Sequence, residues 1–148
     1  MPRLLISDEY SHLFGKEVLR HKYRTLYQEI CDVLRSTDVP LKTKASREKT
    51  KRGKLVYSGK DFNGPLTNAL KAQGWRRRRI NFSNRNYIDL DLCKERVALE
   101  IQFGKYSFVP HNFAKFQYLF EAGDPTLEID IGIEVVPSKS LYDEWFRW

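Results

Sequence analysis

The middle of the chain alternates apolar and polar residues with a period of two. Residues 88–92 read IDLDL, and residues 97–103 read VALEIQF. A period of two is typical of a β-strand with one face in the core, so the pattern predicts two strands. The charged residues 93–96 are few enough to connect them as a hairpin. We expect the polar face of this hairpin to gather four side chains: Asp89, Asp91, Glu100 and Gln102.

The pattern leaves the role and the register of this face open. Alternation of acidic and apolar residues also describes an ordinary hairpin with its polar face in water. Carboxylates crowded on one sheet repel each other, and a hard cation such as Mg²⁺ would relieve that repulsion through oxygen ligands. If Lys94 and Glu95 form the turn, Asp89 lies opposite Glu100 and Asp91 lies diagonal to it.

Apolar spacing predicts the elements around the hairpin. Spacings of three and four residues predict helices over 16–35 and 111–120, and we expect a further helix to begin at Pro65 and to end before Gly74. Residues 55–57 form a candidate short strand. Residues 127–136 alternate again, with Glu128, Asp130 and Glu134 on one face, and a last helix follows Ser138. Together these elements predict an α/β (α+β) fold.

Composition narrows the class of protein. The 148 residues suffice for one domain, 1–148, and the two cysteines show no paired spacing, which favours a reducing cytoplasm. No segment has the apolar length of a signal peptide or a membrane span. The net charge of +7 is concentrated in the first 80 residues, which contain the lysine-rich run 41–54 and four consecutive arginines, 76–79. This basic half indicates a polyanionic partner such as DNA.

Asp91, followed after eight residues by Glu100-Ile101-Gln102, resembles the PD-(D/E)xK nuclease signature with glutamine in place of lysine. This variant is similar to the BglII/BstYI group of type II restriction endonucleases. Residues 39–46, 99–108 and 140–142 also resemble segments of that group, so the likeness runs over roughly residues 30–145. It implies a restriction-endonuclease-like core, in which a central mixed sheet is flanked by helices.

The resemblance implies roles for individual residues. Asp91, Glu100 and Gln102 would be catalytic; Asp91, Glu100 and the carbonyl of Ile101 would bind Mg²⁺; and Asp89 is the alternative ligand. Gln102 cannot accept a proton at neutral pH, so it would only position the attacking water. We expect DNA contacts from the basic segments and from the positions that match the group's recognition regions: Lys42, Lys44, Arg47, Arg76, Arg77, Lys105, Ser138 and Lys139.

Two further residues have alternative roles. An acidic residue on the first helix often assists the metal site in this fold, which makes Glu29 a candidate, although a surface ion pair is the simpler role. His111 is a candidate catalyst, with a surface or capping role as the simpler alternative.

The resemblance also implies a homodimer that cuts double-stranded DNA at a short palindrome, centred on GATC in that group. Lys105 and the pair Ser138-Lys139 differ from the residues expected there, and members of the group are longer, with a C-terminal extension. Two rival functions remain: a DNA-binding protein of this fold that does not cut, and a nuclease that acts on RNA or branched DNA.

Overall fold

A computed structural model describes residues 4–40, 43–47, 49, 52–82, 86–104, 106–122 and 129–145. Its helices are α1 (Gly15–Lys22), α2 (Arg24–Ser36), α3 (Gly59–Ala72), η2 (Tyr106–Phe108, 3-10), α4 (Val109–Glu121) and α5 (Lys139–Trp145). Its strands are β1 (Thr43–Ala45), β2 (Leu55–Tyr57), β3 (Arg76–Asn81), β4 (Tyr87–Lys94), β5 (Val97–Ile101) and β6 (Ile131–Val135).

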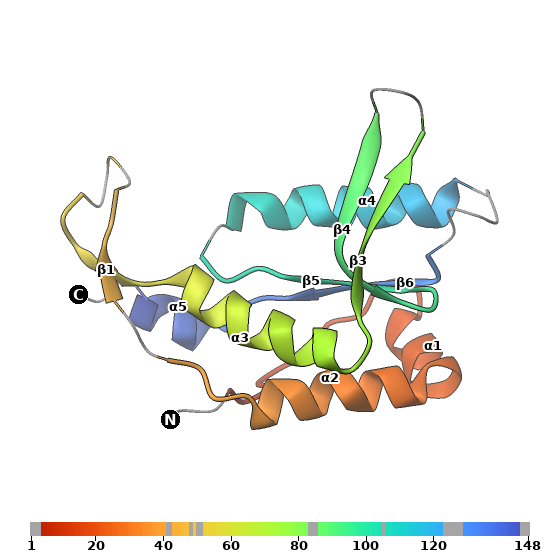
Figure 1. Cartoon of the computed structure of the whole chain (residues 1–148), viewed down its shortest axis with the longest axis horizontal. Coiled ribbons are helices and arrows are strands. Elements are labelled where there is room, and N and C mark those ends of the chain that lie inside the picture. Colours follow the sequence, from red (N-terminus) through yellow and green to blue (C-terminus); the bar gives the residue numbers. More distant parts are fainter. Residues whose placement is uncertain are drawn as a thin grey trace.

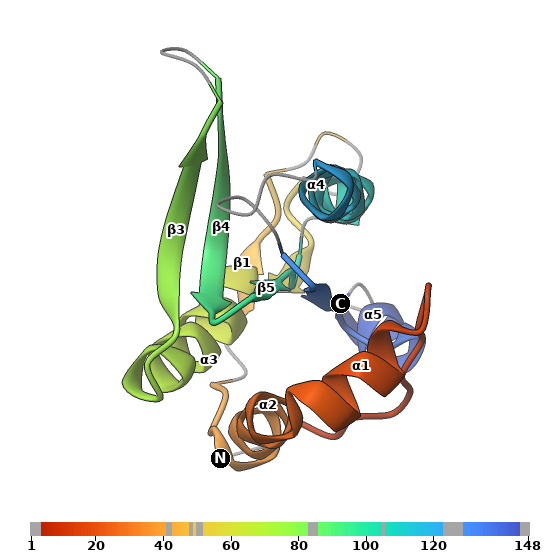
Figure 2. The same ribbon diagram turned by 90° about the vertical axis from the view of Figure 1, so that its right-hand side faces the viewer.

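The central sheet has four strands in the order β3-β4-β5-β6. The β3–β4 and β4–β5 pairs are antiparallel, whereas β5 and β6 are parallel. Helix α4 lies on one side of β5 and β6, and α1 and α2 lie on the other (Figures 1 and 2). The predicted fold, a mixed sheet flanked by helices, is therefore confirmed. β1 and β2 form a separate two-stranded antiparallel sheet.

Apolar side chains cover both faces of the sheet. On one face Val97, Leu99 and Ile101 join the larger core with the buried residues of α1, α2 and α3. On the other face Ala98 and Leu90 pack in a smaller core with the apolar residues of α4. All five residues of β5 are consequently buried, so the alternative of an ordinary hairpin with its polar face in water does not describe this strand.

The predicted helix over 16–35 is two helices. Tyr23 separates α1 from α2 with φ −118° and ψ 36°. Its ring is 5% exposed, and its hydroxyl donates to Asp130 Oδ2 at 2.5 Å. The break therefore coincides with a tertiary contact 107 residues away in sequence, which local spacing does not reveal.

The predicted start of a helix at Pro65 is also wrong, because α3 begins at Gly59 and Pro65 lies inside it. A proline inside a helix removes one backbone hydrogen bond and costs about 3 kcal/mol. Phe62, Leu66 and Leu70 follow at intervals of four and are 1%, 0% and 0% exposed. Burial of this stripe offsets the cost, since each such side chain contributes roughly 1.5–3 kcal/mol.

Other elements match the sequence. The helix expected over 111–120 and the strand expected over 55–57 are present as α4 and β2, while the last strand is shorter than 127–136. Both cysteines are free and buried. Within the described residues, no helix is long and apolar enough to cross a membrane.

Candidate active site

The central hairpin brings Asp91 and Glu100 together. Lys94 pairs with Val97 and Leu92 with Leu99, so the turn is Glu95-Arg96 and not Lys94-Glu95. One step further in this register, Asp91 lies across from Glu100, and its backbone N–H donates to Glu100 Oε1 at 3.2 Å. The register that sets Asp89 opposite Glu100, expected for a Lys94-Glu95 turn, is therefore wrong.

A β-bulge in β4 changes which side chains share a face. Arg76 pairs with Cys93 but Arg78 pairs with Leu90, so β4 has one extra residue between these two pairs. Leu90 therefore packs in the core under α4 while Leu92 packs in the opposite core. Bulges commonly re-aim side chains beside active sites. This one lies at Asp91.

Asp89 does not join the group, which corrects the expectation of a four-residue polar face. Its carboxylate accepts hydrogen bonds from Arg77 at 2.7 Å and from Arg79 at 2.8 and 3.0 Å, both on β3. The hydrogen bond from Arg79 is the main reason that the Asp89 pKa falls to about 2. Asp89 is therefore a structural partner of β3 here.

Glu100 is buried, with 4% exposure, yet it faces charged groups. Its Oε1 accepts a hydrogen bond at 2.5 Å from the ammonium of Lys115, which reaches in from α4. Burial and the nearby Asp91 carboxyl raise the Glu100 pKa to about 7, against the opposing effect of Lys115. Glu100 is thus buried against polar partners on α4 and β4 and is not sealed among apolar side chains alone.

A third carboxylate lies beside this pair. Glu134 on β6 is the register partner of Glu100 on β5. Its Oε1 accepts a hydrogen bond from Asn112 at 3.0 Å, whereas its Oε2 is buried without a hydrogen-bond partner among the described residues. Burial, together with the charge of Glu100, raises the Glu134 pKa to about 7. Asp130, expected on the same face, instead binds Lys22, Tyr23 and Arg96. Glu128 lies outside the described residues.

The acidic cluster of Asp91, Glu100 and Glu134 has the oxygen donors that suit a hard cation. Two facing carboxylates and a buried, unpartnered carboxylate oxygen provide the oxygen ligands that Mg²⁺ and Ca²⁺ prefer. Over the part of the chain that the structure describes, however, no three His, Cys, Asp or Glu side chains are arranged as a metal site. The positive charge at Glu100 is supplied by Lys115.

Replacing Glu134 with glutamine should stabilise the protein at pH 8 and change little at pH 5. Because the folded-state pKa of Glu134 is raised, the carboxyl favours the folded state below about pH 4.5, and this contribution is lost as pH rises through 7. Glutamine keeps an oxygen for Asn112 but never ionises, so we expect a gain of about 1–2 kcal/mol at pH 8. Thermal unfolding without divalent ions at the two pH values measures the difference. An equal effect at both would contradict the assigned titration.

Gln102 and Ile101 lie at the end of β5, where the hairpin meets β6. The backbone N–H of Gln102 donates to the Val135 carbonyl at 2.8 Å. Gln102 is half-buried, and Ile101 is 6% exposed with its side chain in the larger core. This hydrogen bond ties the segment that contains the Glu100-Ile101-Gln102 motif to its parallel neighbour.

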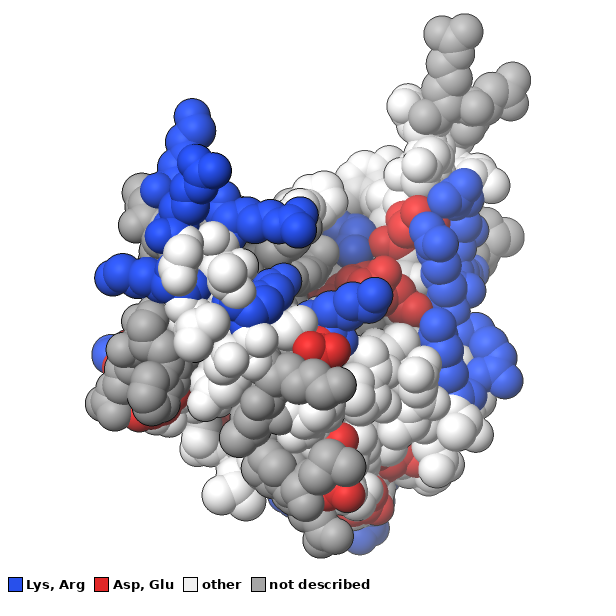
Figure 3. All heavy atoms as spheres, turned by 60° about the vertical axis from the view of Figure 1, so that its left-hand side comes forward, with Lys and Arg blue, Asp and Glu red and all other residues white. Residues whose placement is uncertain are grey.

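Basic side chains gather around a hollow in the surface. Figure 3 shows a hollow with carboxylates at its floor and Lys and Arg gathered on both of its walls. Exposed residues on the β1–β2 side include Lys44 and Arg47, and those on β3 include Arg76, Arg77 and Arg79. The hollow therefore has the charge distribution expected of a site that receives a polyanion while holding a cation at its base.

Several of the predicted DNA-contacting residues have internal partners. Arg76 donates to the carbonyls of Lys71 and Trp75, and Arg77 pairs with Asp89. Lys139 pairs with Asp143 at 2.6 Å, and the Ser138 hydroxyl caps the backbone N–H of Leu141. The predictions for Lys42 and Lys105 lie outside the described residues.

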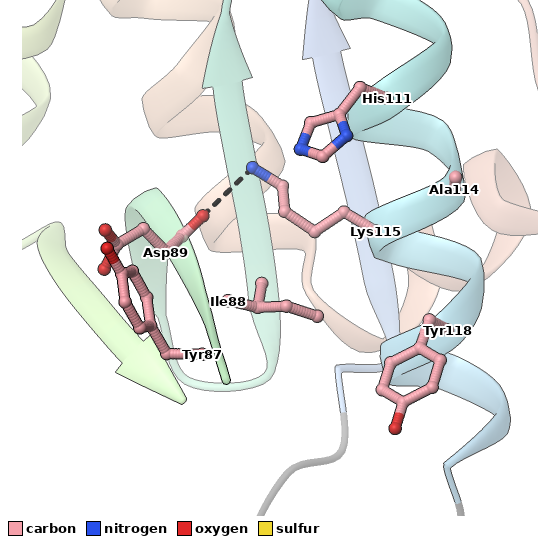
Figure 4. Close-up of a pocket in the computed structure, with 7 residues that line it drawn as sticks. All are labelled: Tyr87, Ile88, Asp89, His111, Ala114, Lys115 and Tyr118. Carbon is pink, nitrogen blue, oxygen red and sulfur yellow. Dashed lines mark hydrogen bonds between the residues drawn. The ribbon is translucent and has the colours of Figure 1, made fainter. Parts of the chain in front are cut away.

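Glu29 and His111 have different surroundings. Glu29 accepts hydrogen bonds from Lys94 at 2.8 Å and from Trp75 at 3.2 Å, which agrees with an ion-pairing role. His111 lines a pocket of about 420 Å³ between β4 and α4, together with Asp89, Lys115 and Tyr118 (Figure 4). It therefore lies one helical turn from Lys115, the residue that pairs with Glu100.

Sequence reasoning missed Lys115 and Glu134. Lys115 follows Asn112 by three residues and precedes Leu119 by four, so it shares the buried face of α4 with both. The signal in the sequence that could have identified Lys115 was a lysine on the core-facing side of a helix. Glu134 became relevant only through the parallel pairing of β5 with β6, which a single sequence does not specify.

Comparison with known proteins identifies the family of the chain. The model of the family "Restriction endonuclease BglII/BglIII" matches residues 7–146. The crystal structure of restriction endonuclease BglII complexed with a DNA 16-mer is similar, with a TM-score of 0.56 and 26% sequence identity. The similarity covers 82% of this chain and 53% of the BglII chain, so the chain spans about half the length of that relative. No curated protein sequence matches the chain. The match over nearly its whole length shows that this chain belongs to the BglII/BglIII family of restriction endonucleases.

Proposed function

We propose that this protein is a type II restriction endonuclease that hydrolyses phosphodiester bonds of double-stranded DNA in the presence of Mg²⁺. The observation that carries the proposal is the juxtaposition of Asp91 on β4 with Glu100 on β5. The hollow with carboxylates at its floor and basic side chains on its walls supports it (Figure 3). Family membership and the likeness to a DNA-bound BglII support it. Two facing carboxylates are difficult to explain in a protein that only binds DNA, because carboxylates repel phosphate.

Each residue of the motif has a chemical role in this proposal. Asp91, Glu100 and the Ile101 carbonyl would hold the ion, and Gln102 would orient the attacking water by hydrogen bonding. A bound Mg²⁺ supplies a lowered water pKa and stabilises charge on the phosphate. Because Gln102 accepts no proton at neutral pH, the substrate phosphate or bulk water must take the proton from the nucleophile.

The basic walls would bind the DNA backbone. Lys44 and Arg47 are exposed on one side, and Arg79 is exposed on the other. Contacts of this kind set the position of the duplex and carry no sequence information directly. We propose a palindromic site, centred on GATC, that is cut by a homodimer, because two-fold protein symmetry matches a two-fold DNA site. A cytoplasmic location follows from this role.

Incubation of plasmid and phage DNA with the protein, with and without MgCl₂, tests the proposal. Discrete fragments that require Mg²⁺, with ends mapping to one palindrome, are the expected result. A smear would indicate a nuclease without sequence preference. Binding without cleavage at any Mg²⁺ concentration would overturn the enzymatic proposal in favour of a DNA-binding protein. Parallel reactions on RNA and on branched DNA separate the remaining rival.

A further inference from the structure

The ammonium of Lys115 occupies the charge centre of the acidic cluster. Nζ donates to Glu100 Oε1 at 2.5 Å and to the Asp89 carbonyl oxygen at 3.0 Å. The side chains of Lys115 and Glu100 are 9% and 5% exposed, so this ion pair is buried. Figure 4 shows the lysine extending from α4 towards β4, across the pocket. An ammonium so placed neutralises a carboxylate that would otherwise be costly to bury.

A divalent ion and Lys115 would compete for the same oxygen. Glu100 Oε1 already accepts the Lys115 ammonium and the backbone N–H of Asp91. An ion coordinated between Asp91 and Glu100 would lie beside a positive charge, and the repulsion between like charges at such a distance is strong away from bulk water. The two cations therefore cannot both be held at Glu100 without a cost.

The pocket provides space for the lysine to move. It has a volume of about 420 Å³ and lies between β4 and α4, with Lys115 on its wall. The lysine side chain has a flexible stem of four carbons, so its ammonium can leave Glu100 while the helix stays in place. His111 and Tyr118 line the same space and are exposed, which keeps this pocket open to water.

We propose that Lys115 is a positioning residue that serves as the built-in counter-ion of the metal-free site, and that a divalent ion binds by displacing it from Glu100. The inference rests on the proposed metal-dependent function. It gives α4, which lies outside the motif of Asp91, Glu100 and Gln102, a role in metal binding. In the metal-free protein, the ion pair with Lys115 offsets the negative charge of Glu100. On metal binding, the ion takes over that charge.

Isothermal titration of MgCl₂ into the metal-free protein tests the proposal without any DNA. Lys115→Met keeps the apolar stem and removes the charge. We expect this variant to bind Mg²⁺ at least about tenfold more tightly than the wild type, a gain of about 1.4 kcal/mol. Lys94→Met is the matched control, because Lys94 also pairs with a half-buried glutamate, Glu29, and should leave the affinity within about twofold.

Lys115→Gln serves as a second variant if the methionine variant does not fold, and Lys115→Arg keeps the charge and should show no gain. Equal or weaker Mg²⁺ binding by Lys115→Met or Lys115→Gln would overturn the proposal, because a purely structural ion pair predicts that result. DNA cleavage by the wild type together with unchanged Mg²⁺ affinity in the variants would overturn the displacement alone. Tighter Mg²⁺ binding in a protein that cleaves no DNA would support the displacement and refute the proposed function.

Discussion

Asp91→Asn and Glu100→Gln should each lower Mg²⁺-dependent DNA cleavage by roughly a thousandfold or more. Loss of a metal-binding carboxylate removes several kcal/mol of transition-state stabilisation, and each 1.36 kcal/mol corresponds to a factor of ten in rate. Both substitutions keep the shape of the side chain. The backbone hydrogen bond from Asp91 to the position 100 side chain is available in both variants, so the hairpin should be retained. Single-turnover cleavage of a plasmid measures the rate.

Two controls distinguish loss of the metal ligands from loss of folding or of DNA binding. Asp143→Asn removes a carboxylate that pairs with exposed Lys139 on α5, and it should cleave at the wild-type rate. Gel-shift assays without divalent ions should give all variants similar DNA affinity, because the basic walls are unchanged. Cleavage within tenfold of the wild type in both site variants would show that the reaction occurs elsewhere.

The hairpin could be predicted from sequence because its signal is local. Alternation over 97–103 places Val97, Leu99 and Ile101 on one face, and the structure has them in one core. The register could not be predicted in this way, because a turn at Lys94-Glu95 would have set Asp89 opposite Glu100. The structure has its turn at Glu95-Arg96 instead. This turn needs Glu95 at φ 52°, a backbone conformation that is uncommon for residues other than glycine.

Features set by long-range packing could not be predicted. The bulge in β4 reverses the alternation at Asp91, although the sequence IDLDL alternates without interruption. The break at Tyr23 follows from its contact with Asp130, and α3 continues through Pro65 because the Phe62, Leu66, Leu70 stripe is buried. In each case a contact distant in sequence outweighs a local preference.

The charge balance of the site is the other part that the sequence obscured. Asp89 and Asp91 are equivalent in pattern, but arginines on β3 neutralise Asp89 and leave Asp91 exposed. Lys115 and Glu134 come from separate elements that only the folded sheet brings beside Glu100. A motif in sequence therefore names candidate ligands, whereas their ionisation depends on neighbours that the motif omits.

Gly59→Ala should destabilise the protein by about 1–3 kcal/mol and reduce cleavage by up to about a hundredfold. A Cβ at Gly59 would lie 2.1 Å from the Phe103 carbonyl oxygen and 3.0 Å from its carbonyl carbon, so backbone has to move. Phe103 directly follows Gln102. It is also held to α3 by a hydrogen bond from its N–H to Asn63 Oδ1 at 3.1 Å and by stacking on Phe62. Thermal unfolding and single-turnover cleavage measure the two effects.

Gly64→Ala is the matched control, because Gly64 lies in the same helix and a Cβ there meets nothing within 4 Å. This variant should lose neither stability nor activity. If Gly59→Ala loses stability and keeps full activity, the contact with Phe103 supports the fold without positioning Gln102. Behaviour of Gly59→Ala identical to that of Gly64→Ala in both measurements would mean that the close approach of α3 to Phe103 is absent in solution.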